Sequence, residues 1–157
     1  MITVKTKKTK SARKTQDVAR MLAREIRFRE SPQARVIALE GNLGAGKTTF
    51  VQGFARALGI RERVASPTFV VMKEYALSHA GARSSQNKAR LIHIDCYRLA
   101  TPKDLTALGF LELLKDKSAI ILIEWADRIR AILPKDAVWI LFCHGEKANE
   151  RMIRITK

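Results

Sequence analysis

The feature that most constrains this chain is a glycine-rich stretch, GNLGAGKT, at residues 41–48. An apolar stretch typical of a strand precedes it at residues 36–39, and an amphipathic helical pattern follows over residues 48–58. Glycines let the backbone fold around an anion so that its N–H groups point inward, and the following helix adds the positive end of its dipole. In this context the motif GxxxxGK[ST] predicts an α/β fold that binds a nucleoside triphosphate.

The positions of the loop have separate expected roles. The Lys47 ammonium can reach the β- and γ-phosphates, and the Thr48 hydroxyl can bind Mg²⁺. The remaining positions act mainly through the backbone. We expect the nucleotide to contact Gly41, Asn42, Leu43, Gly44, Ala45, Gly46, Lys47, Thr48 and Thr49.

Strand and helix patterns alternate along the chain. Strands are expected over residues 2–5, 36–39, 68–75, 90–95, 119–124, 137–143 and 151–155. Helices are expected from Thr15, as the N-cap, to near Pro32, and then over residues 48–58, 101–108 and 110–114, with a basic loop at 78–89. Because the last strands follow one another without a helix, we predict a three-layer P-loop NTPase fold with a central mixed, largely parallel sheet.

Length and charge constrain the class further. The 157 residues predict one domain, residues 1–157, with a basic N-terminal arm over about residues 1–14. The net charge is +15, and residues 1–35 carry eleven Lys or Arg against three Asp or Glu. This excess favours nucleic acid or an acidic protein surface as a partner, and the alternative is a charged surface without a specific ligand.

Apolar runs and cysteines indicate the compartment. The longest apolar runs are strand-sized, well short of the roughly 20 residues of a membrane span. The N-terminus lacks the apolar stretch of a secretory signal, and the two cysteines form no CxxC pair. We therefore expect a cytoplasmic location without membrane association.

Two acidic residues follow apolar strand patterns. Asp95 ends LIHID and Glu124 ends AIILIE. Beside a phosphate loop, such carboxylates bind Mg²⁺ directly or through water, or orient the attacking water. The alternative for each is a capping carboxylate at a strand end. We expect Lys47, Glu124 and Asp95 to be catalytic, and Thr48, Glu124 and Asp95 to form the metal site.

Other candidates lie in the segments that follow the expected strands. Thr68 occupies the interval in which GTPases place a threonine that senses the γ-phosphate, although a threonine held in a turn is the alternative. Trp125 either packs or contacts the nucleotide, and Arg98 acts as an arginine finger or forms an ordinary salt bridge. His93, inside a strand, is expected to be packed or hydrogen-bonded, and the separated histidines form no zinc site.

Missing motifs exclude some nucleotide-binding classes. Asp95 is followed by CYR rather than by the DxxG pattern of signalling GTPases, and no NKxD guanine reader is present. A small-molecule kinase usually carries a longer, arginine-rich lid than residues 78–90 supply. Two alternatives to a simple ATPase stay open: a P-loop kinase of a small metabolite, and a nucleotide switch that binds nucleic acid.

The combination of GNLGAGKTTF, SPTF, HIDCYRL with PKDLTALGF, and IEWADR resembles the bacterial TsaE family over roughly residues 11–155. The resemblance implies a cytoplasmic, Mg²⁺-dependent ATPase of tRNA threonylcarbamoyladenosine (t6A) biosynthesis, required for modification of adenosine 37 in ANN-decoding tRNAs. It implies TsaD and TsaB as partners, with group transfer performed by TsaD and ATP hydrolysis weak without them.

By matching motif, the resemblance also implies site residues. Lys47 would hold phosphates, Thr48 and Glu124 would bind Mg²⁺, and Asp95 would support the metal or water. Thr68 and Trp125 would lie near the nucleotide and the partner surface, together with Tyr97 and Arg98. Thr15 matches a threonine that opens the first helix near the base. Asn42 departs from the aspartate usual in the family, and the basic N-terminus leaves contact with tRNA open.

Overall fold

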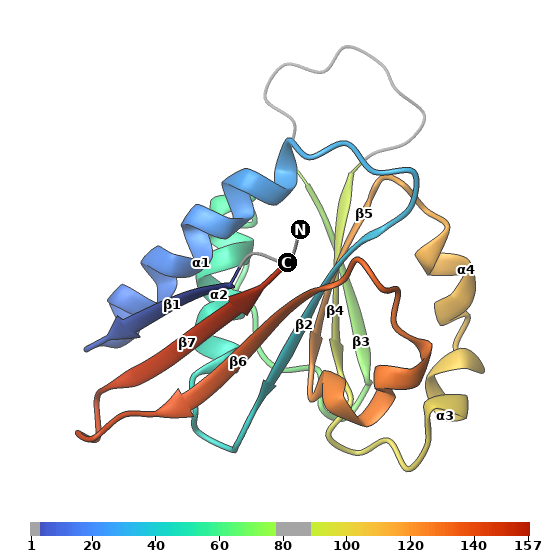
Figure 1. Ribbon diagram of the computed structural model, residues 1–157. Helices are drawn as coiled ribbons and strands as arrows, with labels where there is room; N and C mark the ends of the chain where they lie inside the picture. The colour runs from blue at the N-terminus through green and yellow to red at the C-terminus, as the bar shows by residue number, and fades with distance from the viewer. Residues whose placement is uncertain (1–3, 78–88) are drawn as a thin grey trace.

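The computed structural model describes residues 4–77 and 89–157 (Figure 1). Its strands are β1 (Val4–Thr9), β2 (Arg35–Gly41), β3 (Met72–Ala76), β4 (Arg90–Asp95), β5 (Ala119–Glu124), β6 (Val138–His144) and β7 (Arg151–Thr156). Its helices are α1 (Ala12–Arg27), α2 (Lys47–Ala57), α3 (Pro102–Thr106), α4 (Phe110–Leu114) and the 3₁₀ helix η1 (Ala126–Ile132). The basic loop expected over residues 78–89 lies, except for its last residue, outside the described residues.

All the described strands belong to one seven-stranded sheet with the order β1-β7-β6-β2-β5-β4-β3. The central run β6-β2-β5-β4 is parallel. β7 and β1 extend it antiparallel on one side and β3 on the other. The prediction of a mixed α/β sheet is thereby confirmed.

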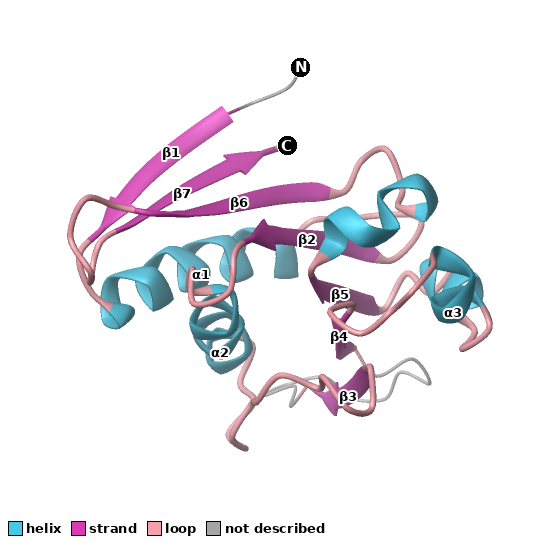
Figure 2. Ribbon diagram, turned by 90° about the horizontal axis from the view of Figure 1, so that it is seen from below, coloured by secondary structure: helices cyan, strands magenta, loops and turns pink. Residues whose placement is uncertain are grey.

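Helices cover both faces of the sheet, and Figure 2 shows α1 and α2 on one side and α3 on the other. The strands bury alternate residues toward each layer: Ile37 and Leu39 of β2 join the core beneath α1 and α2, and Val36 and Ala38 join the core beneath α3, α4 and η1. All six residues of β5 are buried. This explains why its sequence is almost wholly apolar.

The strand predicted over residues 2–5 has different bounds in the structure. β1 covers Val4–Thr9 and pairs antiparallel with β7 at the edge of the sheet, and residues 2 and 3 of the prediction lie outside the described residues. α1 begins at Ala12 because the Ser11 hydroxyl accepts a hydrogen bond from the Lys14 N–H. The prediction that Thr15 is the N-cap is therefore wrong, because Thr15 lies inside the first turn and is 2% exposed.

α1 and α2 pack against each other at a glycine. A Cβ added to Gly53 of α2 would lie 2.6 Å from the Gln16 Cα of α1. Real Cβ atoms essentially never approach another atom that closely. Gly53 therefore allows the close approach of the two helices, and this contact holds α2 in place behind the glycine-rich loop.

Two further elements follow local signals to different extents. Thr101 and Asp104 form the capping box that begins α3, with Pro102 in the first turn, as predicted. The strand predicted over residues 68–75 begins only at Met72, because the segment before it forms a turn.

In the part of the chain that the structure describes, no helix is long and apolar enough to cross a membrane.

Candidate functional site

The glycine-rich loop connects β2 to α2 at the carboxyl ends of the parallel strands, the lower edge of the sheet in Figure 1. Gly46 precedes α2 with φ 103°, a left-handed conformation that glycine adopts without strain. Within the described part of the chain, no side chain caps the N-terminus of α2. The first N–H groups of a helix lack intrahelical partners, so this end is available to an anion.

Lys47, the first residue of α2, is held by the loop itself. The side chain is buried, and its ammonium donates to the Gly41 carbonyl and, at 3.0 Å, to the Asn42 carbonyl. It lies 4.0 Å from the centre of the Trp125 ring. Burial lowers the pKa of Lys47, and nearby carboxylates, Glu124 foremost, oppose that shift.

Glu124 ends β5 and is 3% exposed. One carboxylate oxygen, Oε2, accepts a hydrogen bond from the Thr48 hydroxyl at 3.0 Å, and Oε1 lies 2.8 Å from Nε2 of His93. His93 is fully buried, and its Nδ1 has no hydrogen-bond partner among the residues that the structure describes. Because an ionised carboxylate only accepts hydrogen bonds, Nε2 of His93 is the donor in this contact. The prediction of a hydrogen-bonded histidine is confirmed, and its partner is a candidate catalytic residue.

Asp95 ends β4 directly beside Glu124, its partner in the register of β4 and β5. Its Oδ2 accepts hydrogen bonds from the Ser66 hydroxyl and, at 3.0 Å, from the Thr68 hydroxyl. Its Oδ1 accepts the Tyr97 N–H at 2.8 Å. Asp95 thus holds the turn at residues 66–68 against the end of the sheet.

These side chains surround one cavity of about 350 Å³ at the N-terminus of α2. Most of the predicted site residues meet there, on segments far apart in the sequence. Its lining consists of Leu43, Gly44, Gly46, Lys47, Thr48, Thr49, Ser66, Thr68, Asp95, Tyr97, Glu124 and Trp125. Ser66 was not predicted as a site residue, and its position in the SPTF stretch was the available signal.

Some predicted residues do not line this cavity. Gly41 and Asn42 border a separate depression of about 340 Å³, which shares Trp125 with the first. Ala45 is buried within the loop. The Thr15 hydroxyl lies 2.9 Å from that of Thr9, and its methyl group packs near Gly46 behind the loop.

Aromatic side chains form the outer wall of the cavity. Trp125 has φ 57°, which is uncommon for a bulky residue, and its ring lies 5.1 Å from that of Tyr97 between centroids. Arg98 instead lies over the exposed Phe69 ring, 4.5 Å from its centre. In this conformation Arg98 is not among the residues that line the cavity.

The oxygen atoms of the cavity suit Mg²⁺ only together with phosphate. Among the described residues, no three His, Cys, Asp or Glu side chains gather to hold a metal. The Thr48 hydroxyl and the Glu124 carboxylate are nevertheless 3.0 Å apart, with Asp95 beside them. Mg²⁺ in phosphate-binding enzymes uses one or two carboxylates plus substrate phosphates, so this donor set fits the ion when a phosphate supplies the remainder.

Comparison with known proteins places this geometry in a family. A family model described as "Threonylcarbamoyl adenosine biosynthesis protein TsaE" matches residues 9–153. The chain belongs to the TsaE family. Members of this family take part in t6A biosynthesis, as the description of the family model states.

Individual TsaE relatives support the assignment. The chain is 36% identical over 129 residues to the tRNA threonylcarbamoyladenosine biosynthesis protein TsaE of Treponema pallidum, which covers 82% of this chain and 86% of that protein. It is 38% identical over 121 residues to the TsaE protein of Bacillus subtilis, covering 77% and 68%. The crystal structure of YdiB from B. subtilis is similar, with a TM-score of 0.74 and 32% identity over 99% of this chain and 86% of that one.

Proposed function

We propose that this TsaE protein is a Mg²⁺-dependent, cytoplasmic ATPase that acts on a TsaD–TsaB complex during threonylcarbamoylation of adenosine 37 in ANN-decoding tRNAs, without transferring the group itself. The observation that carries the proposal is the convergence of Lys47, Thr48, Glu124 and Asp95 on the cavity at the uncapped N-terminus of α2. The family assignment supports the pathway.

Binding of ATP begins with the loop. The N–H groups at the start of α2, which are hydrogen-bond donors, and the positively charged Lys47 ammonium form the side of the cavity that attracts an anion. Lys47 exchanges its hydrogen bonds with the Gly41 and Asn42 carbonyls for phosphate oxygens. The buried position of Lys47 strengthens this contact, because charges interact more strongly away from water.

The two carboxylates, Glu124 and Asp95, have different roles in the proposed hydrolysis. Thr48 and Glu124 would hold Mg²⁺, which neutralises developing charge on the phosphates when it is bound. Asp95 keeps the Thr68 hydroxyl at the cavity wall, where it would contact the terminal phosphate of a bound ATP. Glu124 and Asp95 are the two groups that can accept a hydrogen bond from the attacking water.

Docking on the TsaD–TsaB pair has support from the surface near the site. Phe69 and Val70, which follow Thr68, are 85% and 68% exposed, and Leu43 of the loop is 78% exposed. Large apolar side chains exposed beside a site are typical of a protein interface. A partner that covers them would close the cavity and exclude water from it.

The deciding experiment measures phosphate release from ATP and Mg²⁺ by the purified chain, with and without its cognate TsaD–TsaB pair. We expect stimulation by the pair, and loss of about 100-fold or more of the stimulated rate in Glu124→Gln. Lys47→Ala should abolish nucleotide binding as well as hydrolysis. Glu112→Gln, which removes an exposed carboxylate of α4, is the control for loss of one negative charge.

Two outcomes would redirect the proposal. Hydrolysis that the pair leaves unchanged would contradict the partner assignment, and normal hydrolysis by Glu124→Gln would contradict the catalytic assignment. With ATP labelled in its γ-phosphate, recovery of the label in a nucleoside or sugar instead of free phosphate would indicate a small-molecule kinase.

A further inference from the structure

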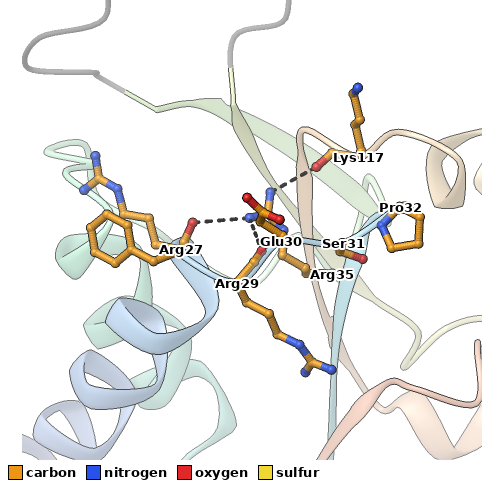
Figure 3. A pocket seen from close by; sticks show the side chains of 8 residues that line it. Arg27, Arg29, Glu30, Ser31, Pro32, Arg35 and Lys117 are labelled. Atoms are coloured by element: carbon orange, nitrogen blue, oxygen red, sulfur yellow. Dashed lines mark hydrogen bonds between the residues drawn. The ribbon is translucent and has the colours of Figure 1, made fainter.

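Another depression, of about 650 Å³, lies at the opposite edge of the sheet from the glycine-rich loop and from the two hollows described above. It is formed where α1 ends and β2 begins, together with the turn before β5 (Figure 3). Its lining is rich in cations and includes Arg27, Arg29, Arg35 and Lys117, with Glu30 as the acidic member. Nothing in the ATPase proposal uses this surface.

Arg35 forms the fixed base of the depression. Its Nη1 donates to the carbonyl groups of Ile26, Arg27 and Arg29 at 3.3–3.4 Å, and its Nη2 donates to the Lys117 carbonyl at 3.2 Å. The guanidinium thereby satisfies the exposed carbonyls at the negative end of α1. Arg35 offsets the negative potential of these carbonyl groups. The carbonyls at the helix end therefore do not attract the surrounding cations away from an external anion.

The cations on the rim form no ion pairs with any residue that the structure describes. None of the salt bridges found among these residues involves Arg27, Arg29 or Lys117. Figure 3 shows their side chains pointing apart around Arg35. A single small anion would contact only one of them, whereas an extended polyanion can contact all three.

An exposed aromatic ring stands among these cations. Phe28 is 80% exposed, and the Arg27 guanidinium lies 5.8 Å from the centre of its ring. Stacking on an aromatic ring and on arginine planes is how proteins hold the unpaired bases of single-stranded RNA. Arginine also binds phosphate bidentately. The surface therefore combines a partner for bases with partners for phosphates.

The basic surface continues along α1. Arg24, one turn before Phe28, is also exposed. The apolar stripe of the helix, by contrast, is buried in the core at Ala19, Leu22, Ala23 and Ile26. A membrane-surface helix inserts its apolar stripe between lipids, and this stripe is not available. These observations favour a nucleic acid over an anionic membrane.

We propose that the surface formed by Arg27, Phe28, Arg29 and Lys117 binds single-stranded RNA. Phosphates contact the three cations, and an unpaired base stacks on Phe28. This inference goes beyond the proposed ATPase function and does not depend on it.

The test is fluorescence anisotropy of a labelled single-stranded RNA of about 12 nucleotides, with the full chain alone at low salt. We expect the triple variant Arg27→Gln/Arg29→Gln/Lys117→Gln to bind about tenfold or more weakly, and its log affinity to depend less steeply on log salt by about 2, because three phosphate contacts are lost. The matched control is Arg56→Gln/Arg61→Gln/Arg63→Gln, which removes the same charge from a different depression. It should weaken binding by less than about threefold.

Phe28→Leu separates stacking from charge. It keeps an apolar side chain without a ring, so we expect weaker binding of single-stranded RNA by about fivefold and unchanged binding of duplex RNA, whose bases are already stacked. Equal weakening by the two triple variants would show that only net charge matters and would overturn the proposal. Absence of RNA binding at low salt would do the same.

Competitors distinguish the other polyanions. Displacement of the RNA by polyglutamate at equal charge concentration would show that an acidic protein is the better ligand. Tight binding to phosphatidylserine vesicles would show that an anionic membrane is the better ligand. Either result would overturn the assignment to RNA. ATP hydrolysis by the same variants, measured with TsaD–TsaB, should be unchanged, so failure of one proposal is distinguishable from failure of the other.

Discussion

His93 contacts the candidate catalytic site without lining its cavity. Its Nε2 lies 2.8 Å from Oε1 of Glu124, while the Thr48 hydroxyl contacts the other carboxylate oxygen. The carboxylate is therefore held from two sides, and its plane is set by residues on β4 and α2. A histidine that orients a carboxylate in this way acts through position rather than by contact with substrate.

Replacement of His93 tests this positioning. We expect His93→Leu to lower the rate constant of ATP hydrolysis by about tenfold or more, with the dissociation constant of a fluorescent ATP analogue changed by less than about threefold. His93→Gln, whose amide can donate near the Nε2 position, should keep most of the activity. Equal loss in both variants, or loss of nucleotide binding in step with activity, would indicate a purely structural histidine.

The two cysteines should react differently. Cys96 is fully buried, and burial, assisted by Asp95 and Asp127, raises the pKa of its thiol to about 12, whereas Cys143 is exposed. Because the thiolate is the reactive form, we expect a thiol reagent at about pH 8 to modify Cys143 alone in the folded protein. Cys143→Ser should abolish the fast reaction, and denaturant should release the second thiol. Fast modification in Cys143→Ser would contradict the buried position of Cys96.

At the scale of elements, the contact between α1 and α2 positions the glycine-rich loop. Gly53→Ala should lower the free energy of unfolding by about 2 kcal/mol, because the new methyl group meets the backbone of α1. In an open helix the same change would stabilise the protein by up to about 1 kcal/mol, so the sign of the effect is decisive. Urea denaturation followed by circular dichroism measures it. Arg56→Ala, an exposed change in the same helix, should alter stability by less than about 0.5 kcal/mol.

Elements with local signals were predictable from the sequence. The loop at residues 41–48, the capped start of α3 and the apolar strand β5 each lie within a short stretch whose residue types determine the conformation. For β1 a strand was expected only over residues 2–5. Its extension to Thr9 was not predictable, because its lysines show no apolar alternation and its pairing with β7 joins segments far apart in the sequence. The start of α1 was misplaced because Ser11 and Thr15 are both good capping residues, and only burial of Thr15 in the fold separates them.

The candidate site also combines features that were predictable from local sequence with features that depend on the fold. Lys47, Thr48, Glu124 and Asp95 were expected at one cavity, because a loop motif and strand ends converge at one edge of a parallel sheet. The contacts between these residues and their supports were not predictable. Ser66 and Asp95 are 29 residues apart, and His93 and Glu124 are 31 apart. Side chains of such separation meet only through the register of the strands.

For the whole molecule, net charge is an expected source of instability. At +15 the folded chain repels itself, and salt screens that repulsion. We expect the melting temperature to rise by about 2–4 °C between about 20 mM and about 300 mM NaCl. The double variant Lys5→Gln/Lys7→Gln, which removes two charges from the exposed edge strand, should show a smaller rise. A fall in melting temperature with salt would mean that ion pairs outweigh repulsion.

β2 connects the two sites proposed above. Arg35 stands at its first residue and Gly41 at its last, and a strand of that length spans about 20 Å. If both proposals hold, the bases and phosphates held at the first end and the ATP held at the second would use different residues, so one ligand would not compete with the other for contacts. The length of β2 would then set the distance between a bound polymer and the place where phosphate chemistry occurs.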